Sequence, residues 1–259
     1  MKRVAIIQAR MSSSRFPGKV LQRIGEMPMI VFMLHRVARA ALLDQIVVAT
    51  STDHTDDALA EEVRRSGFEC LRGDLLDVLS RFNAAANTCS ADVVVRLTGD
   101  CPLIDVDLVD KAVATLISGK FDYVSNVEPP TYPNGLDVEA FTRAALAQAN
   151  AHAESASDRE HVTPYIRRNK ALFKHMNLRS IWDMSSLRWT VDHADDLALI
   201  RAMVAGLPEG DPSLADRFDF LRVFETRRAE LPDNQHARMD YHAGQAPTPV
   251  DRMDQKLQQ

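Results

Sequence analysis

Short runs of apolar residues alternate with longer amphipathic segments through the first half of the chain. Uninterrupted apolar runs are typical of strands buried on both faces of a sheet, and apolar residues three and four positions apart predict helices with one buried face. The pattern predicts strands over 4–7, 45–50, 68–71 and 92–97, and helices over 28–40, 56–67, 77–88 and 108–119. Because strands and helices alternate with short connections, we expect an α/β protein with a mainly parallel sheet and helices on both faces, a three-layer, Rossmann-like arrangement.

The second half of the chain is less regular. We expect strands over 122–125, 135–141 and 186–193, followed by helices over 196–206 and 215–229. Prolines and a glycine over 126–135 predict a loop, and residues 158–166 are expected to lie in a loop as well. Beyond Leu231 the chain is polar and has little pattern, so we expect one domain over 1–231 and a polar tail over 232–259.

Length and composition exclude several classes of protein. The chain has 259 residues, of which 46% are hydrophobic and 26% charged, as in an ordinary globular protein with one large core. The net charge of −5 argues against a general nucleic-acid-binding protein, because there is no basic excess to neutralise a phosphate backbone. Cys70, Cys89 and Cys101 lack C-x-x-C spacing, which indicates a reducing compartment without disulfides. With no apolar stretch long enough to span a membrane and no signal peptide, we expect a cytoplasmic protein.

A basic loop follows the first predicted strand. It carries Arg10, Arg15 and Lys19, separated by serines and by Pro17-Gly18. Backbone N–H groups and hydroxyls of such a loop can surround phosphate oxygens, and the cations offset their charge. A solvated loop with three ordinary surface cations is the alternative. A local basic loop in an acidic protein favours a small anionic ligand, such as a polyphosphate.

Polar residues also follow two other predicted strands, at 51–53 and 98–100. In parallel α/β sheets ligands bind beyond the carboxyl ends of the strands, so we expect these tips to converge with the basic loop. Asp100 lies between Gly99 and Pro102, where a carboxylate can hold Mg²⁺, an ion that prefers one or two carboxylates together with phosphate oxygens and water. A turn aspartate that caps its own backbone is the alternative interpretation.

Two further acidic pairs have a functional and a structural interpretation. Asp105 and Asp107 form the D-x-D pattern of metal-dependent glycosyltransferases, but acids placed just before a helix also suit its dipole, which we favour. Asp137 and Glu139 share one face of the predicted strand 135–141, where they could contact sugar hydroxyls or a metal, or form a charged exposed face.

Several separated segments resemble the sugar-activating cytidylyltransferases. Residues 9–19, ARMSSSRFPGK, match the pattern A-R-x-x-S-x-R-hydrophobic-P-G-K, and residues 96–104, RLTGDCPLI, resemble the segment that supplies a metal-holding aspartate, although Thr98 stands where Gln is frequent. Residues 135–141, GLDVEAF, and 158–166, DREHVTPYI, resemble the branch related to spore coat polysaccharide protein F, which is similar to CMP-Kdo and CMP-sialic acid synthetases. The resemblance covers about residues 3–205.

The resemblance implies a nucleotidyltransferase α/β/α fold with a mainly parallel mixed sheet, and a homodimeric enzyme that transfers CMP from CTP to a 2-keto-3-deoxy or nonulosonic acid for a surface glycan. It assigns catalysis to Arg10, Lys19 and Asp100, and a Mg²⁺ site to Asp100 and Asp192. The expected substrate-binding residues are Ala9, Arg10, Ser13, Arg15, Lys19 and Thr98, with Arg72, Asp77 and Arg81 toward the nucleoside and Asp137, Glu139, Arg159 and His161 toward the acceptor.

Two interpretations from other classes stay open. One is a glycosyltransferase that uses a finished nucleotide sugar and binds its metal through Asp105 and Asp107. The other is a non-catalytic nucleotide-binding protein, against which the joint presence of Lys19, Asp100 and Asp192 argues.

Overall fold

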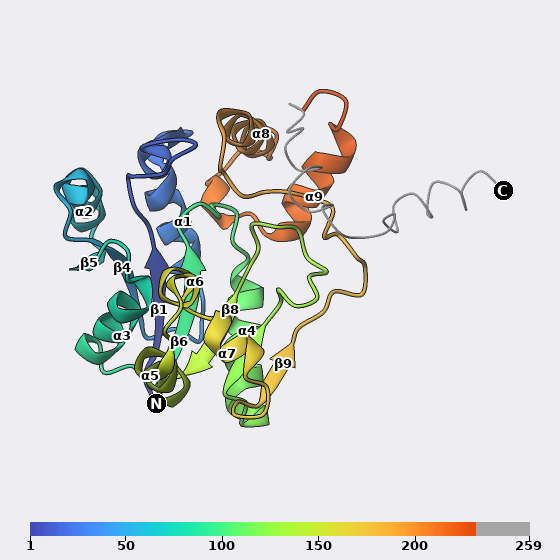
Figure 1. The fold of residues 1–259 in the computed structure, drawn as a ribbon. Helices are drawn as coiled ribbons and strands as arrows, with labels where there is room; N and C mark the ends of the chain where they lie inside the picture. Colours follow the sequence, from blue (N-terminus) through green and yellow to red (C-terminus); the bar gives the residue numbers. More distant parts are fainter. Residues whose placement is uncertain (232–259) are drawn as a thin grey trace.

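The computed structural model describes residues 1–231, and within them seven strands form one sheet (Figure 1). The strands lie in the order β5-β4-β1-β6-β8-β7-β9, with bounds β1 (Arg3–Gln8), β4 (Gln45–Ser51), β5 (Glu69–Gly73), β6 (Val93–Thr98), β7 (Tyr123–Ser125), β8 (Glu139–Thr142) and β9 (His175–Asn177). Strands β5, β4, β1 and β6 are parallel, β8 is antiparallel to β6 and β7, and β7 is parallel to β9. The prediction of a mainly parallel mixed sheet is therefore confirmed. A separate antiparallel pair consists of β2 (Arg23–Ile24) and β3 (Met27–Pro28).

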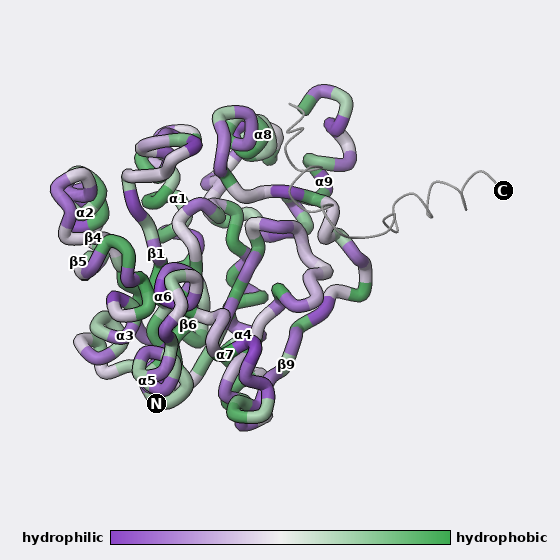
Figure 2. The backbone as a smooth tube through the Cα atoms, in the orientation of Figure 1, coloured by the Kyte–Doolittle hydropathy of each residue, from purple (hydrophilic) through white to green (hydrophobic). Residues whose placement is uncertain are grey.

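Helices cover both faces of the sheet because alternate residues of the central strand β1 point to opposite sides. Val4 and Ile6 belong to one buried cluster with residues of α3 (Val78–Thr88) and α5 (Arg143–His152). Ala5 and Ile7 belong to the other, with residues of α1 (Met29–Val37), α2 (Asp57–Arg65), α4 (Val106–Gly119) and α8 (Ala194–Ala205). Figure 2 shows the resulting division on α2, which is purple outside and green toward the sheet. The helices are α1 (Met29–Val37), α2 (Asp57–Arg65), α3 (Val78–Thr88), α4 (Val106–Gly119), α5 (Arg143–His152), α6 (Ala156–His161), α7 (Pro164–Arg168), α8 (Ala194–Ala205) and α9 (Arg217–Thr226), with short 3₁₀ helices η1 (Lys19–Leu21), η2 (His54–Asp56) and η3 (Pro212–Leu214).

A buried guanidinium connects the end of the described chain to the sheet domain. Arg36 on α1 donates hydrogen bonds to the carbonyls of Ile104, at 3.0 Å, and of Ala215, at 2.8 Å. Burial lowers the pKa of Arg36 to about 10, which still leaves it charged at neutral pH. Arg36 therefore ties the segment before α9 to the turn that follows β6.

Some sequence-based expectations are wrong. The segment 186–193 forms only an isolated β-bridge between Arg188 and Asn134, because its backbone bonds to two loops rather than to a strand. The strand expected over 135–141 begins only at Glu139. The expected loop over 158–166 lies mostly in α6, where the Ser155 side chain caps the first turn, and in the start of α7.

Helix α5 and strand β9 are not predicted by the sequence pattern. The polar tail expected over 232–259 lies outside the described residues. Among residues 1–231 no helix has the length and apolar character needed to cross a membrane.

Candidate active site

A cavity of about 480 Å³ lies beyond the carboxyl ends of β1 and β6. Its walls come from the loop after β1, the turn after β6, the C-terminal end of α6, and the segments 134–137 and 188–192. Two of the three expected strand tips thus meet at the cavity. The third tip, residues 51–53, does not line the cavity. It is linked to the basic loop through the buried carboxylate of Asp56, which accepts hydrogen bonds from the backbone N–H groups of Ser51 and Met11.

The basic loop is folded back on itself at Met11. The Met11 carbonyl accepts hydrogen bonds from the backbone N–H groups of Ser13 and Gly18, both at 2.9 Å. Gly18 has φ of 71°, a left-handed conformation that favours glycine, and the 3₁₀ helix η1 begins at the next residue. This turn directs Lys19 inward, where only 9% of its side chain is exposed.

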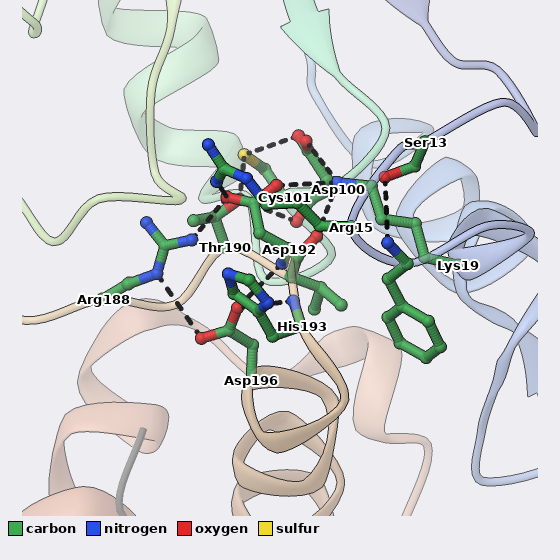
Figure 3. Close-up of polar contacts among 12 residues, drawn as sticks. Ser13, Arg15, Lys19, Asp100, Cys101, Arg188, Thr190, Asp192, His193 and Asp196 are labelled. Atoms are coloured by element: carbon green, nitrogen blue, oxygen red, sulfur yellow. Dashed lines mark hydrogen bonds and ion pairs between the residues drawn. The ribbon is translucent and has the colours of Figure 1, made fainter. Parts of the chain in front are cut away.

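The Lys19 ammonium is the centre of a charged cluster (Figure 3). Its Nζ donates hydrogen bonds to Asp100 Oδ2 and Asp192 Oδ1, both at 2.9 Å, and to the Val191 carbonyl at 2.7 Å. Burial by itself would lower the pKa of Lys19, but the charges of Asp100 and Asp192 outweigh it and the pKa is raised. Burial would raise the pKa of Asp192, and Lys19 and Arg188 together outweigh it, so that pKa is lowered. Lys19 and Asp192 are therefore both charged at neutral pH.

Asp192 is held from its other side by the start of α8. Asp196, in the first turn of that helix, accepts hydrogen bonds from the backbone N–H groups of Asp192 and His193 at 2.8 and 2.9 Å. Arg188 forms ion pairs with Asp192 and Asp196, and in Figure 3 it lies on the side away from Lys19. Arg188 is not among the residues singled out from the sequence, because an i,i+4 spacing brings side chains together on a helix and a strand is predicted here.

Asp100 is fixed by close packing of its backbone. A Cβ on Gly99 would lie 2.9 Å from Ala9 Cβ and 3.1 Å from the Gln8 carbonyl, so glycine is required for the approach to the basic loop. The Asp100 carbonyl accepts hydrogen bonds from Val191 N at 2.8 Å and from Thr190 Oγ1 at 3.2 Å. The turn after β6 therefore joins the basic loop to the segment that carries Asp192.

Most of the residues expected to bind substrate or metal come together in the cavity. Those that line it are Ala9, Arg10, Ser13, Arg15, Lys19, Arg81, Thr98, Asp100, Asp137, His161 and Asp192. Additional lining residues that the sequence did not single out include Arg96, Asn134, Glu160, Arg188 and Thr190.

Four expected residues are not brought into the cavity, because their side chains bond elsewhere in the protein. Arg72 donates to the backbone carbonyls of Ser51 and Asp53, at 2.7 and 2.8 Å. Asp77 caps α3 and pairs with Arg159, which also bonds to Asn150. Glu139 is buried between Arg96 and the Tyr123 hydroxyl.

The D-x-D pair also lies away from the cavity. Asp105 is buried, caps α4 by accepting from Asp107 N at 2.9 Å, and pairs with Arg217. These contacts match the structural interpretation of the motif and leave the glycosyltransferase hypothesis without a metal site at this position.

The end of α6 reaches the cavity in a strained conformation. Val162 has φ of 70° and ψ of −55°, with Thr163 N donating to the His161 carbonyl at 2.8 Å, which is a γ-turn. A β-branched residue at positive φ costs about 1–3 kcal/mol. The turn presents Glu160 and His161 to the cavity, and Glu160 lies 3.5 Å from Arg10.

A mainly parallel sheet with a basic loop beyond its first strand and paired carboxylates opposite a buried lysine defines a nucleotide-handling α/β enzyme. The family model described as "Cytidylyltransferase" matches residues 4–199. The chain therefore belongs to the cytidylyltransferase family and is a nucleotidyltransferase.

Individual relatives agree with this assignment. The chain is 40% identical to an uncharacterised protein of Methanocaldococcus jannaschii over 77% of this chain and 82% of the relative. It is 33% identical to the spore coat polysaccharide biosynthesis protein SpsF of Bacillus subtilis over 76% and 84%, respectively. It is also 38% identical to a 3-deoxy-manno-octulosonate cytidylyltransferase of Pelobacter propionicus, over 45% of each chain.

Solved structures show the same fold. A cytidylyltransferase from Leptospira borgpetersenii aligns with a TM-score of 0.85 and 30% identity, covering 90% of this chain and 98% of that one. A CMP:2-keto-3-deoxy-manno-octonic acid synthetase, solved with CTP, aligns with a TM-score of 0.63 and 20% identity, over 79% of this chain and 99% of that one.

Proposed function

We propose that this protein transfers CMP from CTP to an acidic sugar in a Mg²⁺-dependent reaction that releases pyrophosphate, in the synthesis of a surface polysaccharide. The observation that carries the proposal is the cluster in which Lys19 joins Asp100 and Asp192 beside the basic loop. Family membership supports the nucleotide. The name of the Bacillus subtilis relative supports a role in polysaccharide synthesis, and the name of the Pelobacter propionicus relative supports a 2-keto-3-deoxy acid as the acceptor.

The triphosphate suits the basic loop. Arg10 and Arg15 line the cavity with Ser13, so two guanidinium groups and a hydroxyl are available to phosphate oxygens. In the structure Arg10 faces Glu160 and Arg15 Nη1 lies 4.0 Å from Asp192 Oδ2. Phosphate oxygens would compete with these carboxylates for the same cations.

The residues of the cluster fit a magnesium ion. Asp100 and Asp192 already converge on one cationic group, and two carboxylates are the protein ligands that Mg²⁺ commonly uses beside phosphate oxygens and water. When bound, the ion would neutralise phosphate charge and help to orient the attacking oxygen. With the carboxylates engaged by the metal, the Lys19 ammonium would become available to the phosphates.

The nucleoside end suits the cavity wall formed by Ala9, Arg81 and Thr98. Arg81 is buried, and its Nε has no hydrogen-bond partner in residues 1–231, whereas its Nη1 donates to the Asp74 carbonyl at 2.8 Å. A buried N–H without a partner is costly and is satisfied when a ligand oxygen or ring nitrogen accepts it. Arg81 is therefore our candidate for the base or ribose.

The chemistry is positioning and charge stabilisation. A sugar hydroxyl attacks the α-phosphorus and pyrophosphate leaves from the opposite side. The cations of the basic loop, Arg10, Arg15 and Lys19, hold the leaving pyrophosphate and stabilise its developing charge.

The proposal is tested by measuring pyrophosphate release from CTP, UTP, ATP and GTP with Mg²⁺ and a panel of keto sugar acids and sugar phosphates. We expect turnover with CTP and a keto acid, and its loss in Lys19→Ala but not in Lys111→Ala, which removes an exposed lysine of α4. Turnover with a different nucleotide and a sugar phosphate would contradict the substrate assignment.

Metal dependence has a separate test. EDTA should abolish turnover, and Asp100→Asn and Asp192→Asn should each raise the Mg²⁺ concentration needed for half-maximal rate. Asp107→Asn is the matched control, because this carboxylate is 74% exposed and lies outside the cavity. An unchanged magnesium requirement in Asp100→Asn and Asp192→Asn would contradict the proposed metal site.

A further inference from the structure

One residue of the cavity, Asp137, has a backbone that is fixed on both sides and a carboxylate without a protein partner in residues 1–231. The neighbouring residues are clasped by the buried side chain of Asn126: its Nδ2 donates to the Leu136 carbonyl and its Oδ1 accepts from Val138 N, both at 2.8 Å. The backbone on both sides of Asp137 is thereby fixed, and its side chain lines the cavity.

Gly135 fixes the same segment against residues 189–190, next to Asp192. Its φ is 108°, and a Cβ there would lie 2.5 Å from Thr190 N and from the Trp189 carbonyl carbon. A hydrogen bond from Trp189 N to the Asn134 carbonyl, at 2.6 Å, holds the two segments together at this point. Because Thr190 also bonds to the Asp100 carbonyl, Asp137 is positioned relative to Asp100 by packing and not by a flexible loop.

The other acids that line the cavity each have a cationic partner. Asp100 and Asp192 bond to Lys19, and Glu160 lies beside Arg10. The carboxylate of Asp137 forms no hydrogen bond or ion pair within the described part of the chain. A partly buried carboxylate of this kind is costly without a partner, so its oxygens are available to a ligand.

The surroundings of Asp137 also suit a group that exchanges a proton. Burial and the charge of Glu139, with a smaller contribution from Asp100, raise the pKa of Asp137 to about 7, against the opposing charges of Arg96 and Arg167. Cys101, which also interacts with Asp137, is buried and stays a neutral thiol because burial raises its pKa well above the usual value. A general base works best when its pKa is near the working pH.

We propose that Asp137 is the catalytic base that accepts the proton of the attacking sugar hydroxyl, an inference that rests on the proposed nucleotidyl transfer. As the bond from the hydroxyl oxygen to the α-phosphorus forms, the hydroxyl proton passes to a carboxylate oxygen of Asp137. The bond from the α-phosphorus to the bridging oxygen breaks, and pyrophosphate leaves with that electron pair. Asp137 then returns the proton to solvent. Asn126 acts through Asp137 as a positioning residue.

The test compares wild type with Asp137→Asn and Asp137→Glu, using whichever nucleotide and acceptor the wild-type enzyme turns over. A general base contributes about 10²–10⁴-fold, so kcat of Asp137→Asn should fall at least a hundredfold. The acidic limb of the wild-type rate profile, in which activity falls below about pH 7, should disappear in this variant. Asp137→Glu keeps a carboxylate and should keep both measurable activity and the limb.

Binding of CTP at wild-type affinity by both variants shows that the site is folded. An Asp137→Asn enzyme that keeps kcat within a few-fold of wild type, or that loses acceptor affinity while retaining the acidic limb, overturns the assignment of a base. Because wild-type turnover is measured first, failure of this inference is distinguished from failure of the proposed function.

Discussion

Replacing Lys19 with methionine tests whether the charged cluster stabilises the fold as well as the reaction. Methionine is similar in length but removes all three hydrogen bonds of the ammonium, and it leaves Asp100 and Asp192 facing each other. The control is Lys111→Met, which changes an exposed lysine in the same way.

The magnitude follows from burial. Breaking a fully buried ion pair costs about 3–5 kcal/mol. Here the lysine side chain is 9% exposed but the carboxylates are 27% and 26% exposed, so water can solvate them and we expect the lower value of about 2–3 kcal/mol in the free energy of unfolding. For a domain of this size that corresponds to a Tm lower by roughly 4–12 °C.

The pH dependence has a definite sign. The pKa of Asp192 is lowered by folding, so its contribution to stability is present above its unfolded pKa, about 3.9, and is lost as the pH falls through the folded value. The stability difference between wild type and Lys19→Met should therefore be full at pH 7 and shrink below about pH 4.

The measurements are urea unfolding at pH 7 and at pH 3.5, and thermal unfolding with and without Mg²⁺. Magnesium should raise the Tm of Lys19→Met more than that of wild type, because the variant's carboxylates lack the lysine counter-ion. A variant as stable as wild type at pH 7, or one that responds to Mg²⁺ no more than wild type does, would refute the reasoning.

Three further substitutions test separate parts of the structure. Gly135→Ala should lower the unfolding free energy by at least about 2 kcal/mol, because backbone strain adds to the clash with Thr190. Gly67→Ala is the control: its φ is 84° and the space around it is open, so it should cost only the backbone strain. Urea unfolding measures both variants. Arg15→Ala should raise the dissociation constant for CTP about tenfold or more, as expected for one lost charge-assisted contact, and calorimetry at low and high salt should show a weaker salt dependence than wild type. Asp105→Ala should lower the unfolding free energy by about 1–3 kcal/mol, because the α4 cap and the ion pair with Arg217 are lost. The kcat of the folded enzyme should not change. A stable variant without activity would instead support a metal site at Asp105 and Asp107.

The parts of the site that the sequence predicted share a simple physical origin. Strand β1 is a continuous apolar run, and its basic loop and Asp100 lie at strand tips, which parallel topology brings to one edge. The apolar pattern and the positions of these polar tips are therefore sufficient to place Lys19 near Asp100.

The errors arise where a pattern has two physical causes. Leu187, Trp189 and Val191 alternate with polar residues as in a strand, but the same alternation serves an extended segment packed between loops, and only the pairing partner distinguishes them. Asp77 and Arg159 are residue types suited to ligands, yet they pair with each other across 82 positions of sequence, which composition cannot reveal. The polar helix α6 has too few apolar residues to produce a helical period.

The site consists of two halves that meet at Asp100. One half, the basic loop and the turn after β6, belongs to the parallel part of the sheet, and we propose that it binds the nucleotide. The other half, segments 134–137 and 188–192, bonds to the first through the Asp100 carbonyl. We propose that segment 134–137 of this half faces the acceptor, whereas Asp192 holds the metal. The Asn126 side chain bonds to the backbone on both sides of Asp137 in segment 134–137. Under the proposed function, Asn126→Ala should therefore lower kcat and acceptor affinity while leaving CTP affinity near that of wild type. Equal losses for both substrates would instead mean that the two halves move as one unit.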